Sequence, residues 1–224
     1  MTIKKMKPAA VIFDLDGTLI DNNAYHIEAW KVFHDKINRP FSAEEYKTVF
    51  NGKINRDIFN YIFQKELPDA DIDRYTEEKE SLYRQLYAPH IQMIPGLTQL
   101  LDALMQAAIP MAIATSGLPA NIEFMFDHLP IRKYFEVIVD ATQIKKGKPD
   151  PEIFLTAAAL MHANPAFCIA FEDSVAGVMS AKNAGMKVVA LTTTHAQDDF
   201  NDPDLVIKDY SNLSIERLLE MINK

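Results

Sequence analysis

Cysteine is almost absent from this chain of 224 residues, and the single thiol, Cys168, excludes an intrachain disulfide. Such cysteine usage is typical of a reducing compartment, so we expect a cytoplasmic protein. Cys168 itself lies in an apolar run, where a free thiol usually packs as a small hydrophobic side chain. We therefore assign Cys168 to the core.

Long hydrophobic runs are also missing. No stretch approaches the roughly 20 apolar residues that a membrane-spanning helix needs. Residues 1–7 are basic, but Asp14 interrupts the apolar run behind them too early for a secretory signal. We therefore expect no membrane span, no signal segment and no membrane partner.

Positive charge is in deficit, since 23 lysines and arginines stand against 31 aspartates and glutamates, a formal net charge of -8. An acidic surface repels polyanions, so nucleic acid is not an expected partner. A small anionic substrate remains compatible, because a bound metal can invert the local field. The composition, 48% hydrophobic and 24% charged, is that of a globular protein with a substantial core.

Buried strands alternate with helices along most of the chain. Apolar runs predict strands at 9–13, 109–114, 137–139, 167–171, 186–191 and 205–207. Helix signals lie between them: Pro119 opens one helix, Asp150 caps a second, and Gly185 ends a third. This alternation predicts an α/β fold with a Rossmann-like parallel-sheet core.

Residues 22–91 have a different character, because strand-like runs vanish there. Apolar residues at helical spacing predict four helices, near 24–37, 42–50, 58–63 and 71–87. Ser42 followed by Glu45 is a capping-box pattern at the start of the second helix. We predict a helical-bundle cap domain at 22–91, inserted into an α/β core made of residues 1–21 and 92–224.

Polar clusters follow four of the predicted strands. They are Asp14/Asp16, Thr115/Ser116, Glu172/Asp173 and Thr192. Ligands of open α/β sheets bind beyond the carboxyl ends of the strands, so we expect the clusters to converge on one crevice. The cap begins directly after the first cluster and is placed to cover that crevice as a lid.

Carboxylates dominate these clusters, and several negative charges at one point require a cation or protons. The carboxylates are Asp14, Asp16, Glu172 and Asp173. Oxygen ligands without His or Cys favour Mg²⁺, which prefers to share its coordination shell with a substrate phosphate. Thr115, Ser116 and the turn at Gly117 offer donors to that phosphate, and Lys148 offers a positive charge.

Each cluster also has a simpler interpretation. A lone D-x-D is often a turn or a helix cap, and residues 172–174 or 115–116 could cap the helices that follow them. Four clusters in this order, each behind a buried strand, favour a shared site. An EF-hand is excluded, because Gly17 arrives two positions early and the flanks are strands.

Four ordered motifs carry a family resemblance: DLDGTL at 14–19, TSG at 115–117, KPDP at 148–151 and EDSVAG at 172–177. They span nearly the whole chain. The sequence resembles the haloacid dehalogenase superfamily, in its β-phosphoglucomutase-like phosphatase branch with a helical cap. His26 and Trp30 add to this resemblance.

The resemblance implies a chemical role for each motif. Asp14 would be the nucleophile that attacks phosphorus and forms an aspartyl-phosphate. Asp16 would protonate the leaving oxygen and then deprotonate the attacking water. Thr115 and Lys148 would hold the transferring phosphoryl oxygens. Dehalogenases and phosphonate-cleaving relatives lack the second aspartate, so Asp16 favours phosphate ester or anhydride chemistry.

The metal ligands are likewise implied by the resemblance. Asp14 and Asp173 would bind Mg²⁺ through their side chains and Asp16 through its backbone carbonyl, with Glu172 acting directly or through water.

Substrate choice is expected to lie in the cap. Its candidate residues are His26, Asn51, Gly52, Lys53, Asn55 and Arg56. Lys53 and Arg56 either meet a second phosphate or sugar hydroxyls, or are solvated surface charges. His26 either has a structural role or contacts the core, senses closure and orients Asp16.

The cap departs from the β-phosphoglucomutases, which have a lysine just before the lid glycine and an arginine three residues after it. Asn51 and Asn55 stand at those places here. The sequence therefore predicts a monomeric Mg²⁺-dependent phosphatase for a small phosphorylated metabolite, such as a sugar phosphate. The alternatives are a phosphosugar mutase and a non-catalytic protein that binds a phosphorylated ligand.

Overall fold

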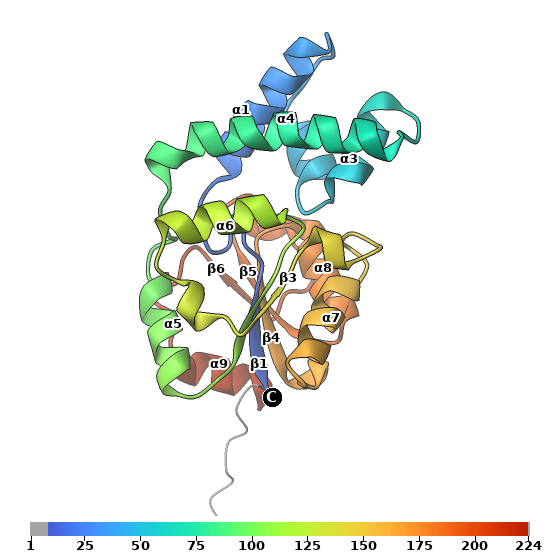
Figure 1. The fold of residues 1–224 in the computed structure, drawn as a ribbon. Coiled ribbons are helices and arrows are strands. Elements are labelled where there is room, and N and C mark those ends of the chain that lie inside the picture. The colour runs from blue at the N-terminus through green and yellow to red at the C-terminus, as the bar shows by residue number, and fades with distance from the viewer. Residues whose placement is uncertain (1–8, 224) are drawn as a thin grey trace, which may run out of the picture.

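Six parallel strands form the central sheet of the protein (Figure 1). The computed structural model describes residues 9–223; the basic segment 1–7 considered above lies outside them. The strand order is β3-β2-β1-β4-β5-β6. The strands are β1 (Ala10–Phe13), β2 (Met111–Ala114), β3 (Val137–Val139), β4 (Cys168–Glu172), β5 (Lys187–Leu191) and β6 (Leu205–Ile207).

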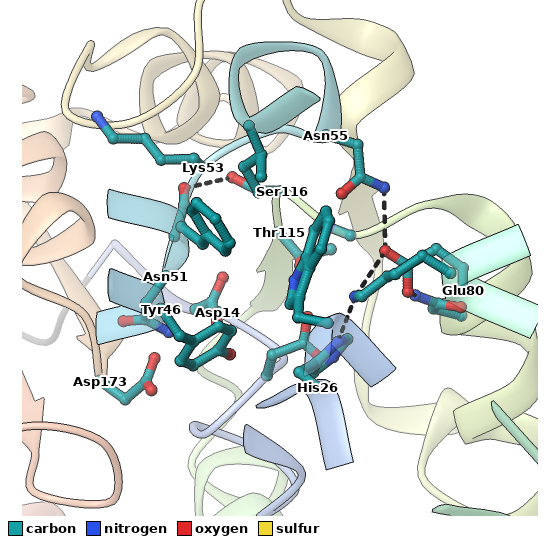
Figure 2. Close-up of a pocket in the computed structure, with 18 residues that line it drawn as sticks. Asp14, His26, Tyr46, Asn51, Lys53, Asn55, Glu80, Thr115, Ser116 and Asp173 are labelled. Atoms are coloured by element: carbon teal, nitrogen blue, oxygen red, sulfur yellow. Dashed lines mark hydrogen bonds and ion pairs between the residues drawn. The ribbon is translucent and has the colours of Figure 1, made fainter. Parts of the chain in front are cut away.

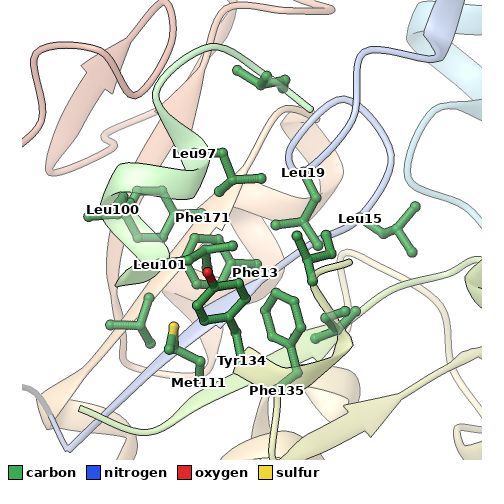
Figure 3. Packing of buried hydrophobic residues seen from close by; sticks show 14 of the residues in the cluster. Phe13, Leu15, Leu19, Leu97, Leu100, Leu101, Met111, Tyr134, Phe135 and Phe171 are labelled. Carbon is green, nitrogen blue, oxygen red and sulfur yellow. The ribbon is translucent and has the colours of Figure 1, made fainter. Parts of the chain in front are cut away.

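The central position of β1 explains its uninterrupted apolar sequence, because helices cover both of its faces. Alternate residues point to opposite sides of the sheet. Val11 and Phe13 belong to one hydrophobic cluster, whereas Ala10 and Ile12 belong to another. Phe13 also stacks on Phe171 of β4, with ring centroids 4.7 Å apart (Figure 3). Packing on both faces thus fixes the strand whose end carries Asp14.

Two layers of helices cover the sheet. Helices α5, α6 and α9 contribute to the cluster of Phe13, and α7 and α8 to the cluster of Ile12. These helices are α5 (Leu97–Gln106), α6 (Pro119–His128), α7 (Glu152–Leu160), α8 (Val175–Asn183) and α9 (Ile215–Ile222). The short 3₁₀ turns are η2 (Ala88–His90), η3 (Arg132–Tyr134), η4 (Ala141–Gln143), η5 (Pro165–Phe167) and η6 (Gln197–Asp199). The predicted α/β class with a Rossmann-like core is confirmed.

A separate group of helices follows β1 and lies beyond the carboxyl ends of the strands (Figure 1). It has a hydrophobic cluster of its own, centred on Trp30, Phe50 and Phe59. Its elements are α1 (Asn23–Lys36), α2 (Ala43–Glu45), the π-helix η1 (Tyr46–Phe50), α3 (Asn55–Phe63) and α4 (Asp69–Tyr87). The chain leaves and returns at one place, where Ile20 and Met93 form an antiparallel bridge.

The Ser42 cap is present, since its hydroxyl accepts a hydrogen bond from the Glu45 amide at 3.0 Å. The helix it starts changes to π geometry from Tyr46 onward, and the Asn51 amide bonds the Tyr46 carbonyl at 2.8 Å. No helix within residues 9–223 is long and apolar enough to cross a bilayer.

Candidate active site

The carboxyl ends of neighbouring strands meet at one small cavity. Asp14 follows β1, Thr115 follows β2 and Asp173 follows β4, and all three line a cavity of about 60 Å³ (Figure 2). They meet because β1 pairs with both other strands. The helical insert supplies the remaining walls, so the cavity lies between the insert and the sheet.

The expectation for Thr192 is wrong. Its backbone amide and hydroxyl both bond the carbonyl of Ile207 on β6. Thr194 reaches the site instead, donating a hydrogen bond to Asp173 Oδ2. The chain after β5 must therefore run two residues further before it turns toward the crevice.

Three buried carboxylates form an acidic cluster beside the cavity. Asp14, Glu172 and Asp173 can each place one oxygen within 4.8 Å of the others. Burial raises the pKa of Asp14 well above its usual range, and burial with the Glu172 charge raises the pKa of Asp173 to about 8. Lys148 Nζ lies 2.6 Å from Asp14 Oδ1 and also bonds Glu172, so one ammonium faces three acids.

This cluster fits a hard divalent cation. It offers only carboxylate oxygens, and its three acids lie around the Lys148 ammonium. The Asp16 side chain is not part of the three-residue cluster. Asp14, Glu172 and Asp173 are thus the side chains of the site that could hold a metal ion together.

Two glycines allow the backbone to approach these acids closely. A Cβ on Gly17, whose φ is +70°, would lie 2.1 Å from Asp173 Oδ2. A Cβ on Gly177 would lie 1.9 Å from the Glu172 carboxylate. Any larger side chain at either position would displace an acid of the cluster, which gives the motif glycines a steric reason.

The helix-cap interpretation of residues 172–174 also holds. Ser174 is the N-cap of α8, its hydroxyl accepting a bond from the Gly177 amide at 2.9 Å. Glu172 Oε2 accepts bonds from the amides of Asp173 and Ser174, each at 3.0 Å. Capping and charge clustering therefore coexist, because the first turn of α8 orients the acids.

Asp16 lies in a different environment from Asp14. Its Oδ1 accepts a hydrogen bond from Asn22 Nδ2 at 2.5 Å and lies 3.6 Å from His26 Nε2. Burial alone would raise the pKa of Asp16, but the contacts with His26 and Asn22 lower it below its usual value. These contacts favour the ionised form of Asp16, which is the form that accepts a proton from water.

His26 connects Asp16 to a buried ion pair in the insert. Its ring stacks on that of Tyr83, with the ring centroids 3.8 Å apart, and its Nδ1 lies 2.7 Å from Lys79 Nζ. Lys79 in turn bonds Glu80 at 3.1 Å. Both interpretations of His26 are therefore compatible with its position, since it packs in the insert and contacts a core carboxylate.

The predicted phosphate donors lie at the cavity, and one of them already contacts the insert. Ser116 and Gly117 line the cavity with Thr115. The Gly117 amide bonds Thr115 Oγ1 at 2.9 Å, and the Ser116 hydroxyl donates to the Gly52 carbonyl at 2.9 Å. Ser116 therefore links the end of β2 to the insert.

Five of the six candidates in the insert line the cavity: His26, Asn51, Gly52, Lys53 and Asn55. Lys53 Nζ also donates to the Lys148 carbonyl at 2.7 Å. Arg56 does not join them. Its half-exposed guanidinium bonds Asp69 Oδ1 at 2.8 Å on the surface of the insert, so its alternative interpretation as a solvated charge describes its position.

Several residues that the sequence did not single out also belong to the site: Asn22, Asn23, Tyr46, Lys79, Glu80, Asn121 and Thr194. Lys79 and Glu80 are 2% and 4% exposed. They stand beside Glu77 and Glu78 in a charged run, and no local pattern separates the buried pair from its neighbours. Asn22 and Asn23 were visible as a polar pair immediately before a helix.

Comparisons with known proteins agree with this geometry. The family profile described as haloacid dehalogenase-like hydrolase matches residues 11–191. β-Phosphoglucomutase of Bacillus subtilis is 35% identical over 219 residues, which cover 94% of each protein. Fructose-1-phosphate phosphatase YqaB of Escherichia coli is 30% identical over 183 residues, covering 81% of this chain and 95% of that protein.

Solved structures give the same result. A family IA haloacid dehalogenase hydrolase from Entamoeba histolytica superposes with a TM-score of 0.86 at 31% identity, covering 98% of this chain and all of that one. A β-phosphoglucomutase from Clostridium difficile superposes with a TM-score of 0.86 at 27% identity, covering 97% and 98%. The chain belongs to the haloacid dehalogenase-like hydrolases. It is an enzyme of their β-phosphoglucomutase-like phosphatase branch.

Proposed function

We propose that this protein is a Mg²⁺-dependent phosphatase that hydrolyses a small phosphorylated metabolite, such as a sugar phosphate. The observation that carries the proposal is the difference in surroundings between two carboxylates at one cavity. Asp14 lies with Lys148 and the acidic cluster, whereas Asp16 lies with Asn22 and His26. Neighbouring acids held in different environments are suited to different steps of one reaction.

In the first step Asp14 attacks phosphorus and forms an aspartyl-phosphate, while the bond to the leaving oxygen breaks. Asp16 acts here in its protonated form: it gives its proton to the leaving oxygen and is left as the carboxylate. In the second step Asp16 takes a proton from the water that hydrolyses this intermediate. Lys148 and Thr115 hold the phosphoryl oxygens. Asp14 and Asp173, with Glu172 and the Asp16 carbonyl, would hold Mg²⁺, whose positive charge would offset repulsion between the nucleophile and a phosphate dianion.

The insert acts as the lid in this proposal, with residues 22–91 as its extent. Ser116 bonds Gly52 and Lys53 bonds the Lys148 carbonyl, so lid and core touch directly at the cavity. The cavity lies beneath these contacts, so we propose that the lid opens to admit the substrate and to release the product.

The relatives support a phosphorylated carbohydrate as substrate. Their names include β-phosphoglucomutase, fructose-1-phosphate phosphatase and, in Thermotoga maritima, phosphorylated carbohydrates phosphatase. The proposal also includes a monomeric state and a cytoplasmic location, in line with the acidic composition and single cysteine. Light scattering on the purified protein tests the monomer.

A phosphosugar mutase is the second candidate, because a β-phosphoglucomutase is 35% identical over nearly the whole chain. A mutase must grip two phosphates. Asn51 contacts Asn23 and His195, and Asn55 donates to Glu80, so neither place provides the cation found in β-phosphoglucomutases. This difference favours hydrolysis.

A screen of phosphate esters and anhydrides with Mg²⁺ tests the proposal. We expect phosphate release from at least one sugar monophosphate. A lack of release from every ester and anhydride would refute the hydrolase assignment. Rapid interconversion of glucose 1-phosphate and glucose 6-phosphate with a bisphosphate primer would identify a mutase instead.

A further inference from the structure

One wall of the cavity carries polar side chains that the proposed mechanism does not use. Glu80 of α4 and Asn55 of α3 come from the insert, and Asn121 of α6 comes from the core. Glu80 and Asn121 are 4% and 3% exposed. Figure 2 shows Asn55 and Glu80 bonded to each other on the His26 side of the cavity. We call these three side chains the Glu80 cluster.

The Glu80 cluster retains hydrogen-bonding capacity. Glu80 Oε1 accepts bonds from Lys79 Nζ at 3.1 Å and Asn55 Nδ2 at 3.0 Å. Within residues 9–223, Oε2 accepts only from Asn121 Nδ2, at 2.9 Å, although a carboxylate oxygen can accept two bonds. The side chains of Asn55 and Asn121 each keep a second N–H, because a carboxamide has two and only one of them donates to Glu80. A hydroxyl, which both donates and accepts, complements this arrangement.

The positive charge on this side of the cavity is already engaged. Lys79 Nζ contacts Glu80 Oε1 and His26 Nδ1, and it lies 4.9 Å from the centre of the Trp30 ring. A second phosphate here would meet the Glu80 carboxylate, and the nearby Lys79 ammonium is already paired with that carboxylate. Lys53, which also lines the cavity, lies on the other side and bonds the Lys148 carbonyl (Figure 2).

The cluster also spans the contact between insert and core. Asn121 donates to Glu80 across this contact and accepts a bond from Arg84 Nη1 at 2.9 Å. Because the cavity lies between insert and core, a bound leaving group takes space where the two parts meet. A hydroxyl placed between Asn121 and Glu80 satisfies both groups while it separates them.

We propose that the Glu80 cluster binds the leaving group of the substrate and selects an uncharged, polyhydroxylated group over one that carries a second phosphate. This inference rests on the phosphatase function proposed above. It assigns a specificity-determining role to Glu80, Asn55 and Asn121, with a sugar or polyol monophosphate as the substrate class.

The test compares kcat/KM for three phosphoryl donors: a sugar monophosphate that the enzyme hydrolyses, the corresponding bisphosphate, and acetyl phosphate, whose leaving group has no hydroxyl. Loss of a hydrogen bond to a charged acceptor predicts a fall of about 10- to 100-fold in the sugar-to-acetyl ratio for Glu80→Gln. The bisphosphate should gain relative to the monophosphate, because a negative charge has been removed.

Two further variants complete the experiment. Glu78→Gln is the matched control, since Glu78 lies on the same helix and pairs with Lys36 on the surface. It should keep the wild-type ratios. Asn55→Ala should lower the sugar-to-acetyl ratio about 3- to 10-fold, because one uncharged hydrogen bond is lost.

The outcomes distinguish failure of the selectivity role from failure of the phosphatase function. Equal losses for all three donors in Glu80→Gln would mean that Glu80 only holds Lys79; this would overturn the selectivity role and leave the phosphatase proposal intact. If the wild type hydrolyses none of the donors, both fail. Should thermal melting show that Glu80→Gln is unfolded, Asn55→Ala decides, and an unchanged ratio there overturns the inference.

Discussion

At the scale of single residues, Asp14 and Asp16 lie two positions apart and yet have opposite electrostatic environments. Burial raises the pKa of Asp14 above its usual range, with the neighbouring acids adding to the effect. Asp16 is also buried, but His26 and Asn22 lower its pKa. The intervening Leu15 is 1% exposed and packs in the core, which holds the two carboxylates apart.

Asp14→Asn should reduce phosphate release by at least about 10,000-fold, as loss of a nucleophile does in other covalent mechanisms. Asp140→Asn is the matched control, because Asp140 follows β3 as Asp14 follows β1 but caps η4 through the Thr142 amide. The control should keep wild-type turnover. Persistent activity in Asp14→Asn would refute the assigned nucleophile. A full cellular function without turnover would indicate the non-catalytic alternative.

Asp16→Ala should lower kcat by at least about 100-fold for a sugar phosphate, because its alkoxide leaving group needs a proton. The loss in the first step should be smaller for p-nitrophenyl phosphate, whose leaving group is stable without one. Single-turnover kinetics with both substrates measure the difference. Equal losses in that step would show that Asp16 is not the proton donor.

The lowered pKa of Glu80 predicts that the free energy of unfolding depends on pH. Although burial opposes ionisation, Lys79 and His26 help to lower its pKa from 4.5 to about 2. A lowered pKa stabilises the fold above the unfolded value, and this contribution disappears as the pH falls from about 4.5 toward 2. A shift of this size corresponds to roughly 3 kcal/mol.

Urea unfolding of the wild type and Glu80→Gln at pH 7, 5 and 3.5 tests this dependence. The variant should be less stable at pH 7, and the gap should narrow at pH 3.5. Glu78→Gln should show almost no gap at any of these pH values, because Glu78 is only partly buried. A gap for Glu80→Gln that stays constant with pH would contradict the assignment of an ionised Glu80.

The acidic residues of the core site were predictable because each stands where an apolar strand run gives way to polar residues. Asp14 directly follows β1 and Asp173 directly follows β4, and the end of each apolar run is visible in the sequence. Lys79 and Glu80 have no such boundary, since their burial depends on His26 and Asn121, far away in the chain. For Arg56 the sequence left two interpretations open, because helical spacing does not tell which face of α3 meets the core.

At the scale of elements, the turn between η1 and α3 controls how the insert meets the core. Gly52 has a φ of +78°, and a Cβ there would lie 2.6 Å from Ser174 Oγ. Ser174 cannot move freely, because its hydroxyl donates to Glu172 and accepts from the Gly177 amide. The contact therefore couples the position of the insert to the first turn of α8.

Gly52→Ala should lower kcat/KM by about 10-fold or more, because strain and overlap of roughly 1–3 kcal/mol oppose closure. Gly185→Ala is the matched control: its φ is +79°, but nothing lies within 4 Å of its added Cβ. The control should lose stability and keep kcat/KM. Equal losses of kcat/KM in the two variants would show that the Ser174 contact is unimportant.

Elements were predicted best where the sequence alone determines them. The strands and the Ser42 cap follow from local patterns, and the structure contains them. The π-helix η1 was not foreseen. Its geometry accompanies a tertiary contact, the hydrogen bond from the Tyr46 hydroxyl to Asn23 Oδ1 at 2.5 Å, which local spacing does not report.

At the scale of the whole molecule, the topology of the sheet determines where the acidic cluster forms. A parallel sheet with β1 between β2 and β4 brings acids from distant parts of the sequence together. This architecture followed from the alternation of strands and helices. The closeness of insert and core did not, because it depends on contacts such as Ser116 to Gly52.

Removal of divalent cations with EDTA should abolish phosphate release, and Mg²⁺ should restore it. Saturating Mg²⁺ should also raise the melting temperature by roughly 5–10 °C, because a ligand that binds only the folded state stabilises it. Asp173→Asn should lose most of this rise. Full activity in EDTA, or an equal rise in Asp173→Asn, would contradict the assigned metal site.

The antiparallel bridge between Ile20 and Met93 brings the two ends of the helical insert together. Because the outgoing and returning chains lie side by side, an insert of another length or sequence can join the same two points without disturbing β1 or α5. One contiguous gene segment can therefore be exchanged while the sheet remains as it is. A lineage with this architecture can diversify its substrates by recombination as well as by point mutation.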